Sequence, residues 1–339
     1  MRSLRVVVSI LLYAGALQAI AQGTGKPIID VHLHAFAHDS QGPYPSYVCA
    51  PFKRFPVWDP ASGPYVATFT DLVDNPDCGN LIRSQPDDES LMRRTIELMQ
   101  ANNVIGIAGG SRDYVTRWQA AAPDRMIPAL HFRITEQSPS PESIQLMFAG
   151  GEIAVLSEVT IQYQGIEPDD PRFRPWLAKL EEIDMPMGIH IGTGPPGAPY
   201  LGNPDYRGRF HSPLSLEEPL MKHPGLRVYV MHAGWPMLDD TLALLWAHPQ
   251  VYVGIGVINW ALPRREFHRY LKALVEAGFG NRIMFGSDQM VWPETIEVAI
   301  GNIEAAEFLS EDEKRDIFYN NAARFFRFTE RQIEAHHAL

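Results

Sequence analysis

Cysteine, positive charge and long apolar runs are all scarce in this sequence of 339 residues. The two cysteines, Cys49 and Cys78, lie outside any C-x-x-C motif, so a thiol redox site is not expected. Lys and Arg number 29 against 40 Asp and Glu, which gives a formal net charge of −11. An acidic chain without a basic cluster argues against nucleic acid and anionic membranes as partners. Beyond the N-terminus, no apolar run approaches the length of a membrane span.

The one sustained apolar run lies at the N-terminus. Arg2 and Arg5 flank the start, residues 6–17 are mostly apolar, and Ala19-Ile20-Ala21 offers the small residues of an A-x-A cleavage site. This pattern predicts a secretory signal peptide over residues 1–21, cleaved after Ala21, with an uncleaved anchor as the alternative. We therefore expect a periplasmic or secreted protein that is free of the membrane after cleavage.

Residues 35–86 show no sustained period of 2 or 3.6, and they are rich in Pro, Gly, Asp and aromatic residues. The aromatics argue against disorder, so we expect a long ordered excursion that acts as a lid. Cys49 and Cys78 both lie in this segment. In an oxidising compartment they would pair and tie it down, whereas two unpaired thiols are the alternative.

Along the rest of the chain, short apolar segments alternate with helical patterns. Eight strands separated mostly by helices predict a parallel (β/α)₈ TIM barrel in one domain, residues 22–330, followed by a C-terminal tail, residues 331–339. A doubly wound open sheet would alternate in the same way, but the count of eight and the lack of Gly-x-Gly-x-x-Gly after the first strand favour the barrel. The expected strands are 26–31, 104–108, 126–132, 153–159, 186–190, 226–232, 251–257 and 282–288. The expected helices are 87–102, 111–121, 140–149, 171–183, 214–222, 238–247, 264–277 and 294–307.

The first strand ends in Asp30-Val31-His32-Leu33-His34. Side chains at positions i and i+2 of a strand point to one face, so the two imidazoles make half of a metal site. A lone H-x-H is a weak signal, because histidine is often half-buried for structural reasons.

Later strands add further ligand types at their ends: Glu158, His190, His232 and Asp288. Taken singly, each has a structural alternative, such as a core histidine, a helix cap or a partner for Arg133. In a parallel barrel, however, the C-terminal strand ends form one rim around one mouth. We therefore predict a divalent metal site in which these residues converge. Its ligands would be His32, His34, Glu158, His190, His232 and Asp288.

These motifs resemble the amidohydrolase superfamily, and within it the amidohydrolase-related branch that also contains aminocarboxymuconate semialdehyde decarboxylase. The resemblance runs from Ile28 to about Phe328. It is carried by the first-strand H-x-H, the His-ending fifth strand, Val230-Met231-His232-Ala233-Gly234, Phe285-Gly286-Ser287-Asp288 and Asn320-Asn321-Ala322-Ala323-Arg324. It implies that His32, His34, His190 and Asp288 bind metal. His232 would bind a second metal or act on the substrate.

Glu158 departs from the decarboxylase-like members, which lack a fourth-strand carboxylate of this kind. Binuclear members of the superfamily place a bridging Lys-carbamate or Glu at that point. A Glu could serve two divalent ions with its two oxygens, or it could only orient a ligand imidazole. We expect one or two ions, with zinc as the first choice.

The leading functional hypothesis is a metal-dependent hydrolase of a small-molecule amide, ester or lactone. Asp288 would take the proton of an activated water, and His232 would stabilise the oxyanion or hold the second metal. The alternative is a metal-dependent non-oxidative decarboxylase of a small unsaturated or aromatic acid. A secreted barrel that binds a ligand without catalysis is a third hypothesis, which would leave this ligand set unused.

Several residues near the predicted mouth are candidates for contacting a small-molecule substrate. Arg207 or Arg209 would hold a carboxylate, although loop arginines are more often solvated. His131 and Arg133 end the third strand, and we expect one of them to face the mouth. Tyr163 follows the fourth strand, and Trp260 would line the pocket or pack in the core. The helices leave room for a homodimer, but no segment identifies its interface.

Overall fold

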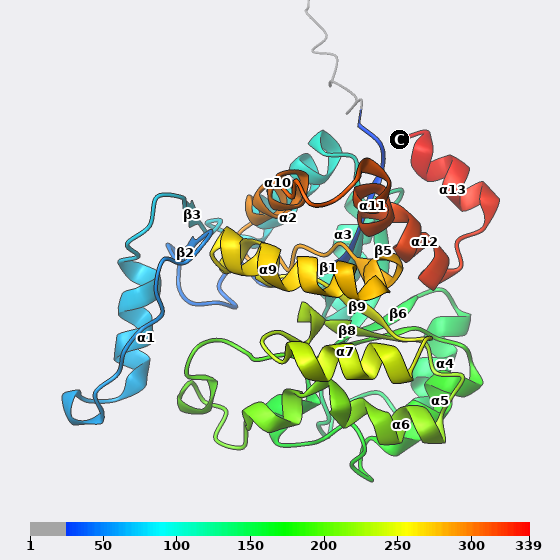
Figure 1. Ribbon diagram of the computed structural model, residues 1–339, viewed down its shortest axis with the longest axis horizontal. Helices are drawn as coiled ribbons and strands as arrows, with labels where there is room; N and C mark the ends of the chain where they lie inside the picture. The colour runs from blue at the N-terminus through cyan, green and yellow to red at the C-terminus, as the bar shows by residue number, and fades with distance from the viewer. Residues whose placement is uncertain (1–24) are drawn as a thin grey trace, which may run out of the picture.

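The computed structural model describes residues 25–339, so the predicted signal peptide lies outside the described residues. Eight parallel strands form the central sheet, and each pairs with its neighbour in the order β1-β4-β5-β6-β7-β8-β9-β10 (Figure 1). They are β1 (Ile28–Ala35), β4 (Val104–Gly110), β5 (Met126–Phe132), β6 (Val155–Val159), β7 (Met187–His190), β8 (Val228–Met231), β9 (Tyr252–Gly254) and β10 (Ile283–Met284).

The sheet closes where β10 meets β1. The Val31 N–H donates to the Phe285 carbonyl at 3.0 Å, and the Asp288 N–H donates to the His32 carbonyl at 2.7 Å. These bonds join the last strand and its continuation to the first, which confirms the predicted (β/α)₈ barrel. The last strand is shorter than the predicted 282–288, because the chain leaves regular strand geometry after Met284.

Helices cover the outside of the barrel, and most of them connect one strand to the next (Figure 1). Their apolar faces pack on the outward side chains of the strands, while a second apolar cluster fills the barrel interior. The helices between and after the strands are α2 (Asp88–Ala101), α3 (Arg112–Ala121), α4 (Pro141–Ala149), α5 (Arg174–Glu182), α6 (Glu217–Lys222), α7 (Leu238–Ala247), α8 (Ile258–Ala261), α9 (Arg264–Leu274) and α10 (Thr295–Glu304).

Three further helices follow α10: α11 (Glu311–Arg315), α12 (Asn321–Phe326) and α13 (Glu330–His337). Phe325 of α12 packs edge-on against Tyr229 in the barrel interior, with ring centroids 5.5 Å apart. The predicted C-terminal tail is therefore largely helical. Thr329 and Gln332 form a capping box that begins α13.

Residues 36–87 form an arm that projects beside the barrel, at the left of Figure 1. It contains the antiparallel strands β2 (Tyr47–Cys49) and β3 (Leu81–Arg83) and the helix α1 (Tyr65–Asp74), which the sequence pattern did not predict. Cys49 and Cys78 are joined by a disulfide, as predicted.

The arm contacts the loop that follows β7. The Tyr65 hydroxyl donates to the Pro196 carbonyl at 2.7 Å, and the rings of Trp58 and Tyr200 lie 4.9 Å apart. Its function as a lid stays a prediction.

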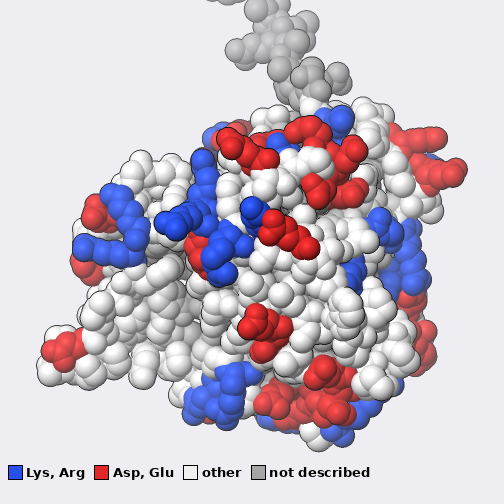
Figure 2. Space-filling view, viewed as in Figure 1, with Lys and Arg blue, Asp and Glu red and all other residues white. Residues whose placement is uncertain are grey.

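Charged groups on the face shown in Figure 2 are interspersed, with Lys and Arg in several separate groups among Asp and Glu. No helix within residues 25–339 has the length and hydropathy needed to cross a membrane.

Candidate metal centre

Irregularities in two strands aim the candidate ligands into the barrel. The pairing of β1 shifts between Asp30 and Leu33, so that Val31 and His32 both turn inward although they are adjacent. The pairing of β6 shifts between Leu156 and Val159, around Glu158. An extra residue in a strand redirects the side chains that follow it, and such bulges are common beside active sites.

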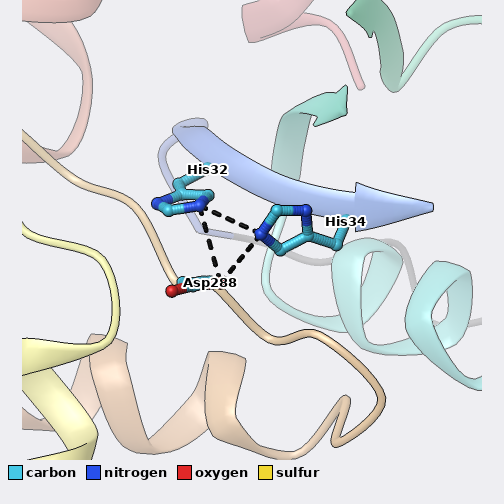
Figure 3. Close-up of side chains that lie close together, drawn as sticks. All are labelled: His32, His34 and Asp288. Atoms are coloured by element: carbon cyan, nitrogen blue, oxygen red, sulfur yellow. Dashed lines mark hydrogen bonds and ion pairs between the residues drawn. The ribbon is translucent and has the colours of Figure 1, made fainter. Parts of the chain in front are cut away.

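His32, His34 and Asp288 form the first group (Figure 3). The Nε2 atoms of His32 and His34 lie 3.0 Å apart. Oδ1 of Asp288 lies 2.9 Å from the His34 nitrogen and 3.5 Å from the His32 nitrogen. Three donor atoms thus converge, two from the first strand and one from the segment that follows β10.

Glu158, His190 and His232 form a second group. Oε1 of Glu158 lies 2.6 Å from Nδ1 of His190 and 3.2 Å from Nε2 of His232, and the two nitrogens are 3.0 Å apart. The structure therefore brings together all six predicted ligands, but divides them into two triads.

Glu158 lies between the triads. Its Oε1 is 3.8 Å from Nε2 of His32, and its Oε2 is 3.9 Å from Nε2 of His34. On the other side, Nδ1 of His232 lies 3.8 Å from Oδ2 of Asp288. The two oxygens of Glu158 therefore lie near donor atoms of both groups, which is the placement needed by a bridging carboxylate.

Hydrogen bonds set the ring nitrogens of the second triad. Nδ1 of His232 donates to the Gly256 carbonyl at 3.1 Å, which leaves Nε2 free toward Glu158. Nε2 of His190 lies 3.4 Å from the Tyr163 hydroxyl, which leaves Nδ1 free toward Glu158. Fixing the far nitrogen in this way selects the tautomer that a metal needs.

Two glycines make room for His32. A Cβ at Gly256 would lie 2.8 Å from Nδ1 of His32, and a Cβ at Gly286 would lie 2.9 Å from the Cβ of His32. The backbone of His232 (φ 60°) and of Asp288 (φ 52°) is left-handed. Non-glycine residues rarely adopt this conformation, and such strain is concentrated at functional sites.

All six residues are buried, with at most 7% of any one of them exposed, which governs their pKa values. Burial lowers the pKa of His32 to about 3 and also lowers the pKa of His190, whereas contacts with Asp288 and Glu158 outweigh burial and raise the pKa values of His34 and His232. Burial by itself would raise the pKa of Glu158 and of Asp288. The neighbouring imidazoles outweigh it and lower both pKa values, so both carboxylates are ionised.

The donor set fits a divalent cation. Imidazole nitrogens and carboxylate oxygens are the ligands of Zn²⁺ and related ions. The Nε2 atoms of His32 and His34 face one another at 3.0 Å, where at most one hydrogen can lie between them, so at least one of the two nitrogens presents a lone pair. Two buried anionic carboxylates supply the charge that a divalent ion would balance.

The amidohydrolase family model matches residues 29–328, which is most of the chain. The chain belongs to the amidohydrolase family. The resemblance inferred from the strand-end motifs is thereby confirmed.

Relatives of this amidohydrolase include both decarboxylases and hydrolases. The chain is 25% identical over 267 residues to the gamma-resorcylate decarboxylase of Rhodococcus jostii (strain RHA1), covering 67% of this chain and 78% of that protein. A probable 2-pyrone-4,6-dicarboxylic acid hydrolase from Acinetobacter baumannii, with citric acid bound, aligns with a TM-score of 0.56 at 16% identity, covering 89% of this chain and 99% of that one. The 5-carboxyvanillate decarboxylase of Novosphingobium aromaticivorans, complexed with manganese, aligns with a TM-score of 0.53 at 18% identity, covering 69% and 80%. At these identities the structural likeness shows the fold alone.

Two adjoining hollows, each of about 430 Å³, share Gln164, Arg172 and Asp205 in their walls, and none of the six candidate ligands lines either one. Tyr163 lines the first and contacts His190, so it connects the hollow with the second triad. Arg133 also lines the first hollow, with its guanidinium 5.7 Å from the Tyr163 ring. Arg207 and Arg209 line the second hollow.

Trp260, predicted to contact the substrate or to pack in the core, is 1% exposed. Its indole N–H donates to the Ser287 carbonyl at 2.6 Å, so it packs behind Asp288 and does not line either hollow. Its placement favours the core role.

Two further histidines lie close to the centre. Either His131 or Arg133 was expected to face the mouth of the barrel, and of these two Arg133 lines the first hollow. Burial lowers the pKa of His131 to about 4, so its imidazole is neutral. His211 was missed by the sequence argument. It is fully buried, its ring lies edge-on to His190 at 5.3 Å, and neither ring nitrogen has a partner among the described residues. It lies in a short turn whose sequence carries no periodic signal.

Proposed function

We propose that this amidohydrolase hydrolyses a small anionic amide, ester or lactone at a binuclear divalent metal centre. The observation that carries the proposal is the second complete triad, Glu158, His190 and His232, beside the first. A divalent ion bound by such residues supplies a Lewis acid that makes water more acidic and polarises a carbonyl group. Two triads with Glu158 between them support two such ions.

Asp288 is suited to proton transfer. The imidazoles of His32 and His34 lower its pKa against the effect of burial, so the carboxylate is ionised and has an oxygen free to receive a proton from the attacking water. The same carboxyl group would then deliver the proton to the leaving group. His232 serves in this proposal as a ligand of the second triad, since its Nε2 points to Glu158.

Tyr163 is suited to hold a substrate oxygen. Burial and the nearby charge of Glu158 raise its pKa well above the ordinary value, so the hydroxyl keeps its proton. If Nε2 of His190 donates to the Tyr163 oxygen, the Tyr163 O–H is available to donate to an oxyanion. A Cβ at Gly194 would lie 2.3 Å from this hydroxyl, so the loop after β7 leaves space around it.

Unpaired arginines favour an anionic substrate. Among the ion pairs of the described residues, none involves Arg133, Arg207 or Arg209, although the chain is acidic overall. Arg133 lines the first hollow, Arg207 and Arg209 line the second, and Asp205 is the one carboxylate in the walls of both. A guanidinium can bind a carboxylate through two parallel hydrogen bonds, which gives a substrate acid group a binding site beside Tyr163.

Non-oxidative decarboxylation is the second candidate. It is favoured by the relative from Rhodococcus jostii, which is named as a gamma-resorcylate decarboxylase and matches 67% of this chain. The same ligands and the same arginines would bind an aromatic acid. Glu158 separates the two candidates, because a single ion held by the first triad has no need of a bridging carboxylate.

Metal analysis with a substrate panel tests the proposal. Mass spectrometry of the purified protein should find two divalent ions per chain, and both His32→Ala and His190→Ala should reduce that number. The panel pairs carboxylated lactones, esters and amides with aromatic and dienoic acids, and it records hydrolysis and carbon dioxide release separately. Wild-type metal content in both variants would contradict the proposed metal site. Release of carbon dioxide without hydrolysis would establish the decarboxylase hypothesis.

A further inference from the structure

Two buried side chains reach across the line where β10 meets β1, in opposite directions. Asp30 belongs to β1, and its Oδ1 accepts from the Ser287 N–H at 2.9 Å and from the His32 N–H at 2.9 Å. Gln289 follows β10, and its Oε1 accepts from the His34 N–H at 2.9 Å. Nε2 of Gln289 donates to the His34 carbonyl at 2.6 Å. We call this pair the seam clasp.

The clasp holds the backbone of the first triad itself. His32 and His34 are bonded directly, and Ser287 and Gln289 are the residues on either side of Asp288. Between the contacts of Asp30 and those of Gln289, the Asp288 N–H donates to the His32 carbonyl at 2.7 Å. The separation of the three ligands is therefore fixed by five hydrogen bonds across or beside the seam.

Regular pairing between β10 and β1 does not fix the separation of these ligands. β10 is two residues long, Ile283–Met284, and it ends four residues before Asp288. Asp30 and Gln289 are both 0% exposed, so water does not compete for their hydrogen bonds. A hydrogen bond left unmade in such a place costs the full desolvation of the remaining group.

The second triad is held by other contacts. His232 is oriented by the Gly256 carbonyl, and His190 by the Tyr163 hydroxyl. Neither partner belongs to the clasp. A change in the clasp should therefore act on one triad and spare the other.

We infer that Asp30 and Gln289 are positioning residues that set the metal affinity of the triad His32, His34 and Asp288, and not of the triad Glu158, His190 and His232. The inference rests on the proposed function in that both triads are taken to bind a divalent ion. Loss of a group that orients a metal ligand costs ~10–100-fold in affinity or activity, which is the size of effect expected here.

Two pairs of variants test the clasp. Gln289→Leu removes both bonds to His34, whereas Gln289→Glu keeps an acceptor for the His34 N–H and replaces the donor with a carboxyl oxygen that faces the His34 carbonyl. Asp30→Leu removes the acceptor shared by His32 and Ser287, whereas Asp30→Asn keeps an acceptor oxygen of the same shape.

Asn321→Leu is the matched control. Asn321 is also a fully buried amide, and its Nδ2 donates to the Gly280 and Ile283 carbonyls at 2.9 and 2.7 Å, where β10 begins. It supports the same strand without touching a ligand backbone. A merely structural role for the clasp predicts that all these variants behave alike.

Metal-free protein would be titrated with Co²⁺, with visible absorption to follow ligand geometry and thermal unfolding to follow stability. We expect Gln289→Leu and Asp30→Leu to weaken one Co²⁺ equivalent ~10–100-fold and to alter its absorption band, with the other equivalent unchanged. Asp30→Asn should retain most of the affinity, and Gln289→Glu should fall between Leu and wild type. Asn321→Leu should lower the unfolding temperature and leave both affinities unchanged.

Wild-type Co²⁺ affinities in both Leu variants would overturn the positioning role of the clasp. An equal loss of affinity in Asn321→Leu would also overturn it. If a Leu variant does not fold, the comparison of Gln289→Glu with wild type decides by the same measure. If the wild-type protein binds a single Co²⁺, the binuclear proposal fails, and the clasp is then judged on that one affinity. Turnover by decarboxylation would likewise remove the proposed function and leave the clasp result standing.

Discussion

The Tyr163 hydroxyl lies 3.4 Å from Nε2 of His190, on the opposite side of the imidazole from Glu158, whose Oε1 lies 2.6 Å from Nδ1. One ring thus joins the wall of the hollow to the centre of the six-residue cluster. The Tyr163 hydroxyl therefore lies between the first hollow and the candidate metal ligand His190.

Tyr163→Phe should therefore reduce turnover while the fold is retained. It removes the group that orients His190 and the proposed donor to the substrate oxygen, and we expect kcat to fall ~10–100-fold. Tyr206→Phe is the control, because its hydroxyl accepts from the Gly194 N–H nearby and does not contact His190. Steady-state kinetics and metal content would be measured for both. Equal losses in the two variants would contradict the role given to Tyr163.

Arg133→Met should weaken the binding of an acidic substrate more than it slows the reaction. The guanidinium lines the first hollow, and its Nε donates to the Thr160 hydroxyl at 3.2 Å. Loss of one charge-assisted hydrogen bond predicts a rise in KM of about 10-fold or more, with kcat little changed. The methyl ester of the same acid should show no such rise. Arg117→Met, on α3 and paired with Glu89, is the control on the outer surface. A KM that rises equally for acid and ester would rule out a contact with the carboxylate.

Replacing Cys49 and Cys78 with Ser should destabilise the arm. The bridge closes a loop across 29 residues of sequence, and the loop-entropy model gives a stabilisation of about 3 kcal/mol. Urea unfolding and limited proteolysis within residues 50–77 would report the loss. In the wild-type protein, denatured without reductant, a thiol reagent should find no free thiols. Two titrating thiols would show that the bridge does not form.

The six residues of the centre could be predicted because each follows a general rule. The two-residue spacing of His32 and His34 puts them on one face of β1, and the parallel barrel brings the ends of β6, β7, β8 and β10 to the same rim. The division into two triads could not be predicted. It depends on the shifts in pairing within β1 and β6 and on the left-handed backbone at His232 and Asp288, which have no sequence pattern of their own.

Other features were missed for equally local reasons. Helix α1 contains Val66, Thr68 and Thr70, and β-branched residues are poor helix formers, so its pattern resembled a loop. His211 reaches His190 only through the irregular loop after β7. The bonds of Asp30 and Gln289 to backbone groups on the facing segment depend on the closure of the barrel, which sequence periodicity does not specify.

Glu158 gives the sharpest separation of the two enzyme hypotheses. Its imidazole neighbours lower its pKa well below the ordinary value against the effect of burial, so both oxygens are available as anionic ligands. If it bridges two ions, Glu158→Ala should lose one metal equivalent and reduce turnover by orders of magnitude. Glu158→Gln keeps the shape but offers only one good donor oxygen, and it should be nearly as impaired.

The measurement is metal content by mass spectrometry beside kcat for wild type, Glu158→Ala and Glu158→Gln. If Glu158 only orients His190, metal content should stay near one ion in wild type and variants, with a loss in activity nearer ~10–100-fold. Glu181→Gln serves as the control, because it neutralises another carboxylate that contacts an imidazole, His223 at 2.7 Å, outside the centre. Two ions in wild type and one in Glu158→Ala, with Glu181→Gln retaining two, would support the bridge. A wild-type protein with one ion that releases carbon dioxide and does not hydrolyse lactones, esters or amides would contradict the hydrolase.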